Sequence, residues 1–126
     1  MEGRDVDRTF DLRGPAAALA AAVRAYTGSP GLEPDPPPLR VALRSAFPAL
    51  PEPDSLEGCT THPALTLRFR APGFGREAVK VVLVPRPERL EARARLELPG
   101  GSYRQATLTR LLGFLEKILE DLHAAE

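Results

Sequence analysis

The chain has 126 residues, 43% of them apolar, and its 17 basic and 17 acidic side chains give a formal net charge of zero. This length and apolar content suit one domain with its own hydrophobic core, which excludes a disordered chain or a disulfide-dependent scaffold. The balanced charge excludes an overall field that attracts nucleic acid or membranes.

Cysteine content and the absence of targeting segments indicate the compartment. Cys59 is the only cysteine, so no internal disulfide can form, which suits a reducing environment. The N-terminal stretch MEGRDVDRTF lacks the apolar run of a signal peptide, and the longest apolar run, AAALAAAV, is far shorter than the roughly 20 residues that span a bilayer. We therefore expect a cytoplasmic protein without a membrane partner. Scarce Asn, Gln, Cys and Met with abundant Pro also fit a thermophilic bacterium, although the low Lys content does not.

The first elements in chain order are a strand and an alanine-rich helix. Residues 6–12, VDRTFDL, have mostly apolar even positions and weakly indicate a strand. In GPAAALAAAVRAYTG, Pro15 suits a first helical position and Gly28 suits a left-handed cap. Because Arg24 is the only charge in this helix, either two of its faces are covered or it packs on a partner.

A Pro-rich connecting region follows at about residues 29–54. Its flanks, PGLEPDPPPL and PALPEPD, should be extended and stiff, because proline disfavours helix in the residue before it. The middle, RVALRSAF, fits either a helix or an alternating strand. We favour a short helix that begins at Pro38 and ends before Pro48.

The second half predicts an antiparallel meander over residues 64–98. Residues 65–70 alternate apolar and polar, residues 79–84 are almost wholly apolar, and residues 90–98 alternate strictly. The joins APGFGREA and PRPER are short enough for hairpins. Each strand should therefore have one buried face and one face in solvent.

A long helix ends the chain. Ser102 and Gln105 form an S-x-x-Q capping box that places the helix start near Tyr103. Large apolar residues then form one stripe, which should pack on the meander. The stripe consists of Leu108, Leu111, Leu112, Leu115, Ile118, Leu119 and Leu122.

Together these elements predict an α+β fold in a single domain, residues 1–126. We expect a three- to four-stranded antiparallel sheet, the long C-terminal helix, and one or two shorter helices packed on one face. Helix-on-sheet layouts carry many unrelated functions, so the fold class alone assigns none.

The stretch EGCTTHP is the first candidate for chemistry, because Cys59 and His62 stand in C-x-x-H spacing. A cysteine nucleophile needs a base within reach and a group that lowers its pKa. No glycine-rich strand-to-helix turn surrounds Cys59, and His62 leads through Pro63 into a strand. A structural zinc site needs four ligands, and the other histidine, His123, lies in the terminal helix. We expect a chemically ordinary thiol and neither a metal nor another cofactor.

Five cations lie on the polar face of the predicted meander: Arg68, Arg70, Lys80, Arg93 and Arg95. In any close hairpin register Lys80 falls near an arginine on each side, and like charges placed opposite each other are unfavourable. An anionic partner would explain these cations, and so would pairing with Glu91 and Glu97, which is the interpretation we favour. No outward aromatic residue accompanies them for base stacking.

Apolar side chains of the alanine-rich helix and the C-terminal helix form a second candidate surface: Leu19, Val23, Tyr26, Tyr103 and Phe114. Phe114 points about 100° away from the centre of the apolar stripe, with Tyr103 on nearly the same side. The Pro-rich region can cover these residues, and so can a second copy of the chain. We favour a homodimer.

Three classes of function follow. The favoured class is a small protein-interaction or self-association module without catalytic activity, which uses the alanine-rich helix, Phe114, or the outward Val82 and Val84. The alternative is a weak anion or nucleic-acid binder that uses the Arg/Lys face of the sheet. An enzyme that depends on Cys59 and His62 comes last, because only two histidines can serve as bases.

Overall fold

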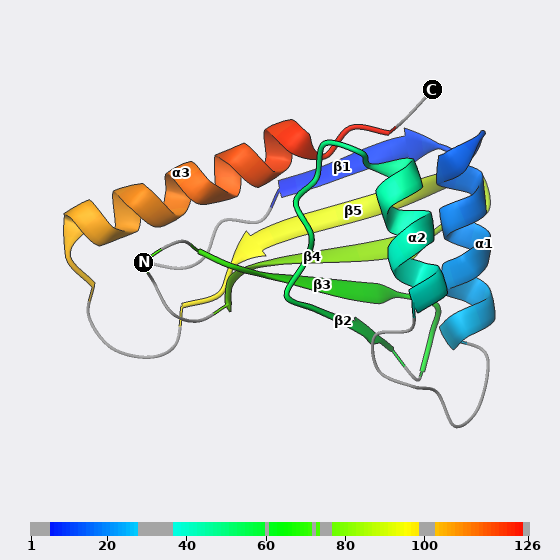
Figure 1. Ribbon diagram of the computed structural model, residues 1–126, viewed down its shortest axis with the longest axis horizontal. Coiled ribbons are helices and arrows are strands. Elements are labelled where there is room, and N and C mark those ends of the chain that lie inside the picture. Colours follow the sequence, from blue (N-terminus) through cyan, green and yellow to red (C-terminus); the bar gives the residue numbers. More distant parts are fainter. Residues whose placement is uncertain are drawn as a thin grey trace.

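A five-stranded antiparallel sheet is the centre of the fold (Figure 1). The computed structural model describes residues 6–27, 37–59, 61–71, 73, 77–98 and 103–124. The strands are β1 (Val6–Asp11), β2 (Ser55–Gly58), β3 (Leu65–Arg70), β4 (Glu77–Pro85) and β5 (Arg89–Leu96). They lie in the order β1-β5-β4-β3-β2, so β1 and β2 form the two edges. The predicted α+β class and the meander of β3, β4 and β5 are confirmed.

The prediction of three or four strands is too low, because both edge strands carry a weak sequence signal. In β1, Arg8 interrupts the series of apolar even positions. In β2, Leu56 is the only buried side chain of four residues. Such a short strand has too few apolar positions to display a period of two.

One face of the sheet carries the apolar core. Leu67 pairs with Val81, and Val81 pairs with Ala94; all three side chains are buried. Residues paired across neighbouring strands lie on the same face, and every second residue returns to that face. The buried positions of β3, β4 and β5 therefore form one apolar surface.

Three helices cover this apolar face: α1 (Pro15–Thr27), α2 (Pro37–Ala46) and α3 (Gln105–Asp121). Leu19, Leu43 and Leu115, one from each helix, belong to the same buried cluster as the strand residues. α1 and α2 lie side by side at one end of the sheet, and α3 lies toward the other end (Figure 1). α1 can be poor in charge because the sheet and α2 both pack against it.

Both shorter helices agree with the sequence. α1 begins at Pro15 as predicted, and Gly14 before it has a φ of 58°, the left-handed conformation that glycine adopts without strain. α2 confirms the favoured helix in the middle of the Pro-rich region. The predicted cap Gly28 lies outside the described residues.

After α2, the Pro-rich region continues as a segment that crosses the sheet, residues 47–54 (Figure 1). Neither a helix nor a strand forms in it, as its prolines predict. Phe47 is buried at its start and packs edge-to-face on Phe10 of β1, with 5.1 Å between the ring centroids. Pro53 is buried near its end. The crossing segment is therefore part of the core rather than only a surface connection.

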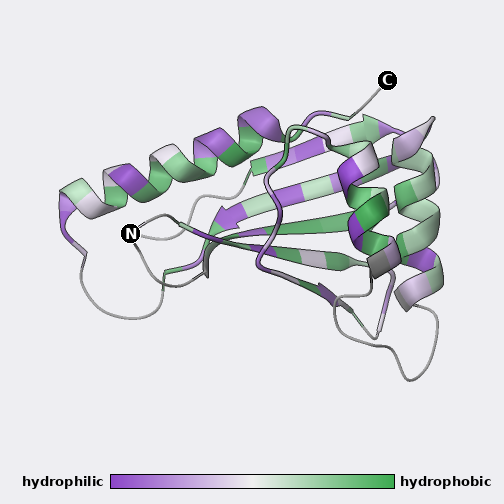
Figure 2. Cartoon of the chain, viewed as in Figure 1, coloured by the Kyte–Doolittle hydropathy of each residue, from purple (hydrophilic) through white to green (hydrophobic). Residues whose placement is uncertain are grey.

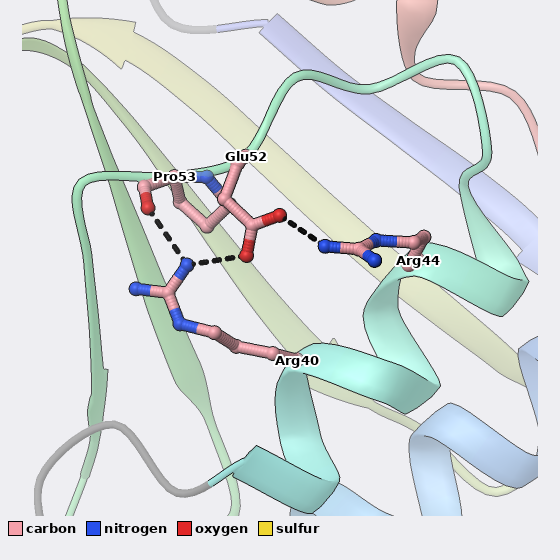
Figure 3. A network of polar contacts seen from close by, with 4 residues as sticks. All are labelled: Arg40, Arg44, Glu52 and Pro53. Carbon is pink, nitrogen blue, oxygen red and sulfur yellow. Dashed lines mark hydrogen bonds and ion pairs between the residues drawn. The ribbon is translucent and has the colours of Figure 1, made fainter.

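Glu52 ties the crossing segment to α2 (Figure 3). Its carboxylate accepts hydrogen bonds from Nη1 of Arg40 at 2.7 Å and from Nη2 of Arg44 at 2.5 Å. Arg40 also donates to the carbonyl oxygen of Pro53 at 3.0 Å. The two arginines are one helical turn apart, so both reach the same carboxylate. The hydrogen bond from Arg40, followed by that from Arg44, lowers the pKa of Glu52.

α3 presents the predicted apolar stripe to the sheet. Leu111, Leu115, Ile118 and Leu119 are buried, and Leu122 is buried just beyond the end of the helix. Hydrophobic and hydrophilic residues alternate along α3 in Figure 2, as expected of a helix with one face in the core.

The predicted start of α3 is wrong. The helix begins at Gln105, and its N-cap residue, Arg104, makes no side-chain capping hydrogen bond. Arg104 has φ −67° and ψ 150°, an extended conformation that stops the helix from beginning at Tyr103. Ser102, the predicted cap, lies outside the described residues.

Candidate interaction surface

The face of the sheet opposite the helices is open. The helices and the crossing segment pack on the apolar face, so nothing within the described ranges covers the other one. We call this second surface the open face. Its central side chains are Thr66, Arg68, Lys80, Val82, Val84, Arg93, Arg95 and Glu97.

Three cations form a row across the open face. Arg68 of β3 pairs with Lys80 of β4, and Lys80 pairs with Arg95 of β5. The prediction that Lys80 has an arginine on each side is confirmed. Directly opposite side chains have Cβ atoms about 4.5–5.5 Å apart, so the three charges repel one another unless something offsets them.

Glu97 offsets two charges of this row. Its Oε1 lies 2.7 Å from Nη1 of Arg68, and its Oε2 lies 3.2 Å from Nζ of Lys80. Partial burial is the largest single influence and raises the pKa of Glu97, but the hydrogen bonds and charges of Lys80 and Arg68 together outweigh it, so the pKa is lowered overall. The resulting stabilisation is complete above pH 4.5 and is lost as the pH falls below that value, where Glu97 becomes protonated.

The remaining cations of the open face also have contacts. Nε of Arg93 lies 3.0 Å from Oδ1 of Asp7, its neighbour on β1. Arg70 and Arg95 take part in further interactions. Glu91 accepts a hydrogen bond from Arg86 at 3.2 Å. These contacts agree with the pairing interpretation, and anion binding by the five cations stays a prediction.

Two valines lie in the middle of the open face. Val82 pairs with Thr66 on one side and Arg93 on the other, and Val84 pairs with Glu91. Both valines are half-buried, although they face away from the core. The open face therefore has an apolar centre beside a row of cations.

The structure separates the predicted interface residues. Leu19 and Val23 are fully buried in this chain's own core, so they have no surface to offer a second chain. Tyr26 and Phe114 are half-buried and pack against the core, and Tyr103, also half-buried, precedes α3. These five residues therefore do not form one exposed apolar surface.

Cys59 lies in the turn between β2 and β3. Its backbone N–H donates to the carbonyl oxygen of Ala64 at 3.0 Å, which closes the turn. Its Sγ lies 3.2 Å from Oγ1 of Thr61 and 3.5 Å from Nδ1 of His62. Oγ1 of Thr61 is in turn 3.1 Å from Nδ1 of His62. The turn thus brings a thiol, a hydroxyl and an imidazole together.

The expectation of a chemically ordinary thiol at Cys59 does not agree with the contacts of this turn. The hydroxyl of Thr61 lowers the pKa of Cys59 most, and the backbone amides of Thr61 and His62 lower it further. Residue types alone do not indicate this arrangement, because a hydroxyl and two backbone amides provide the stabilisation in place of a basic side chain. The thiol is therefore more acidic than an ordinary cysteine.

We expect Cys59 to be alkylated by iodoacetamide with a pH midpoint below that of free cysteine, because only the thiolate reacts. Thr61→Val, which keeps the shape but removes the hydroxyl, should move this midpoint upward. The control Thr66→Val makes the same change on the open face and should leave the midpoint alone. A midpoint equal to that of free cysteine would contradict the stabilised thiolate.

Within the described ranges, no group of three His, Cys, Asp or Glu side chains is placed so that it could bind a metal ion. His123 lies two residues beyond the end of α3, and not within the helix as expected. It lines a cleft of about 620 Å³ with Phe10, Asp11 and Arg13, and Cys59 does not line this cleft.

Comparison with known proteins gives no assignment: no family model matches the chain, and no curated protein or solved structure matches it. Among the described helices, none combines the length and the hydropathy required to cross a membrane.

Proposed function

We propose that this protein is a non-catalytic interaction module that forms a homodimer through the open face of its sheet. The observation that carries this proposal is that all three helices pack on one face, which leaves the other face uncovered within the described part of the chain. Domains are built from two or more packed layers, and an uncovered sheet face with apolar residues at its centre is a surface that a further layer can cover.

The arrangement of charges favours a second copy as that layer. Consider a two-fold axis that runs between the two sheets, perpendicular to the strands and level with Val82. This axis sets Val82 against its own copy. The same axis places Arg95 of each chain over Glu91 of the other, because these residues lie two positions to either side of Arg93 on β5, and Arg93 pairs with Val82. Opposite charges then meet at two positions of the interface, whereas Arg93, at the level of Val82, meets its own copy and has its charge offset only by Asp7 beside it.

The experiment that tests this proposal is a mass measurement by size exclusion with light scattering at micromolar concentration. We expect a dimer for the unchanged chain and a folded monomer for Val82→Glu, which would bury a carboxylate against its copy. Val41→Glu makes the same change on α2, where Val41 is 67% exposed, and should leave the dimer intact.

Two results would contradict the proposal. A monomeric mass for the unchanged chain would refute the homodimer. A dimer that survives Val82→Glu but dissociates with Phe114→Glu would move the interface to the helical side.

The row of Arg68, Lys80 and Arg95 favours a second candidate, a weak anion or nucleic-acid binder. Arg68, Lys80 and Arg95 stand side by side on the open face, and a polyanion binds such aligned cations in a salt-sensitive way. A monomer retained on heparin at low salt, with retention lost in Arg68→Ser/Arg70→Ser/Arg93→Ser, would favour this candidate over the dimer.

A further inference from the structure

The free edge of β1 has a cleft beside it. β1 pairs only with β5 in the described sheet, so the backbone groups on its outer side have no strand partner there. α3 packs mainly over β5 and β4, and a cleft of about 430 Å³ lies between β1 and α3. The two elements that form its walls lie side by side in Figure 1. An unpaired strand edge next to a groove is the geometry that extended peptides use when they add a strand to a sheet.

The cleft has an apolar floor and an acidic wall. Val6 of β1 and three leucines of α3 form the floor: Leu112, Leu115 and Leu119. Glu116 and Glu120 stand one helical turn apart on the wall made by α3. Among the described residues of the lining, Arg8 is the one cation, so their charges sum to −1. A side chain that enters the cleft is therefore favoured when it is apolar or basic.

Arg8 itself lies on the helix-facing side of β1. It pairs with Ala92 and has the same parity as Val6 and Phe10, which pair with buried residues of β5. Arg8 is nevertheless exposed and makes no ion pair with any described residue. A charge that points inward from an edge strand discourages indiscriminate strand pairing, so the edge should accept only selected sequences.

A second copy of β1 is a poor occupant of this edge. A two-fold axis normal to the sheet keeps the two apolar faces together only when even-numbered residues pair with even-numbered ones. The two such registers with the longest overlap set Arg8 opposite its own copy, or Asp7 opposite Asp11 of the copy. Both registers place like charges directly opposite each other, which is destabilising. A segment with a different sequence avoids this conflict.

We propose that the free edge of β1, together with the cleft beside α3, binds an extended segment of another protein by strand addition. The segment carries apolar and basic side chains on the side that faces the cleft. The apolar side chain packs on Val6 and Leu112, and the basic side chain forms ion pairs with Glu116 and Glu120. This surface is separate from the open face, so occupation of the cleft and dimerisation are independent.

Selection of random linear peptides displayed on phage against the full chain tests this proposal. We expect the selected peptides to share an apolar residue two positions from a lysine or arginine. Their affinity should fall about tenfold or more for Glu116→Lys/Glu120→Lys, since charge-assisted hydrogen bonds are lost. The control Glu57→Lys/Glu88→Lys makes the same charge change at two exposed sites away from the cleft and should bind as the unchanged chain does.

Backbone methylation of a selected peptide distinguishes strand addition from other modes. Every second backbone N–H of an added strand points at β1. N-methylation at these positions should therefore weaken binding about tenfold, whereas N-methylation at the positions between them should have little effect. Equal effects at all positions would indicate a helical or irregular peptide and would overturn the proposal. The proposal would also fail if no peptide were selected, or if the Glu116→Lys/Glu120→Lys change altered the dimer mass instead of peptide binding.

Discussion

Replacing Phe47 with Ala is expected to lower the free energy of unfolding by about 3–5 kcal/mol, the usual loss for a buried phenylalanine. Phe47 is 1% exposed and packs edge-to-face on Phe10, with an angle of 62° between the rings. Its backbone N–H donates to the carbonyl oxygen of Leu43 at 2.8 Å, which holds the ring over the sheet where α2 ends. Removing the ring leaves a cavity between β1 and the crossing segment, which proline-rich backbone cannot easily close.

Urea unfolding followed by circular dichroism measures this loss. Val41→Ala removes apolar atoms from an exposed position on α2, so it should change the stability by less than about 0.5 kcal/mol. A loss below about 1.5 kcal/mol for Phe47→Ala would mean that the crossing segment does not contribute to the core.

The path of the crossing segment is the part of the fold that the sequence predicts least. Prolines indicate that residues 47–54 form neither helix nor strand, but they do not indicate which face of the sheet the segment crosses. That path depends on long-range contacts, such as the ring pair of Phe47 and Phe10 and the bridge from Glu52 to α2. In contrast, β3, β4, β5 and α3 are predictable, because their apolar residues repeat with a period of two or 3.6 over many positions.

The capping box at Ser102 shows the limit of local motifs. The S-x-x-Q spacing predicts a helix start near Tyr103, but the backbone of Arg104 is extended and the helix begins at Gln105. A capping motif forms only where the backbone angles of the cap residue permit it, and the approach of the chain to the sheet sets those angles.

Some contacts of the candidate surface are likewise predictable from the sequence, and others are not. Alternation along β3, β4 and β5 is enough to predict that Lys80 lies between two arginines, since this result holds in any close register. The bridge from Glu97 to Arg68 and Lys80 depends on one particular register. The contact of Cys59 with Thr61 depends on the dihedral angles of one turn, which residue types alone do not determine.

Two substitutions on nearly opposite faces of α3 should change the stability in opposite directions. Leu115 is 1% exposed and belongs to the stripe that packs on the sheet, so Leu115→Ala should cost about 2–5 kcal/mol. Gly113 lies two residues earlier on the exposed side, where an added Cβ would meet no atom within 4 Å. Gly113→Ala should therefore raise the stability by about 0.5–1 kcal/mol, because alanine loses less backbone entropy in a helix.

Urea unfolding of both variants measures the two effects on one helix. Opposite signs are expected because burial dominates at position 115 and helix propensity dominates at position 113. The double variant should show the sum of the two changes within about 0.5 kcal/mol, provided that the sites act independently. A stabilising Leu115→Ala, or a destabilising Gly113→Ala, would mean that α3 presents a different face to the sheet. In that case the cleft between β1 and α3 would have different walls, and the strand-addition proposal would fail with it.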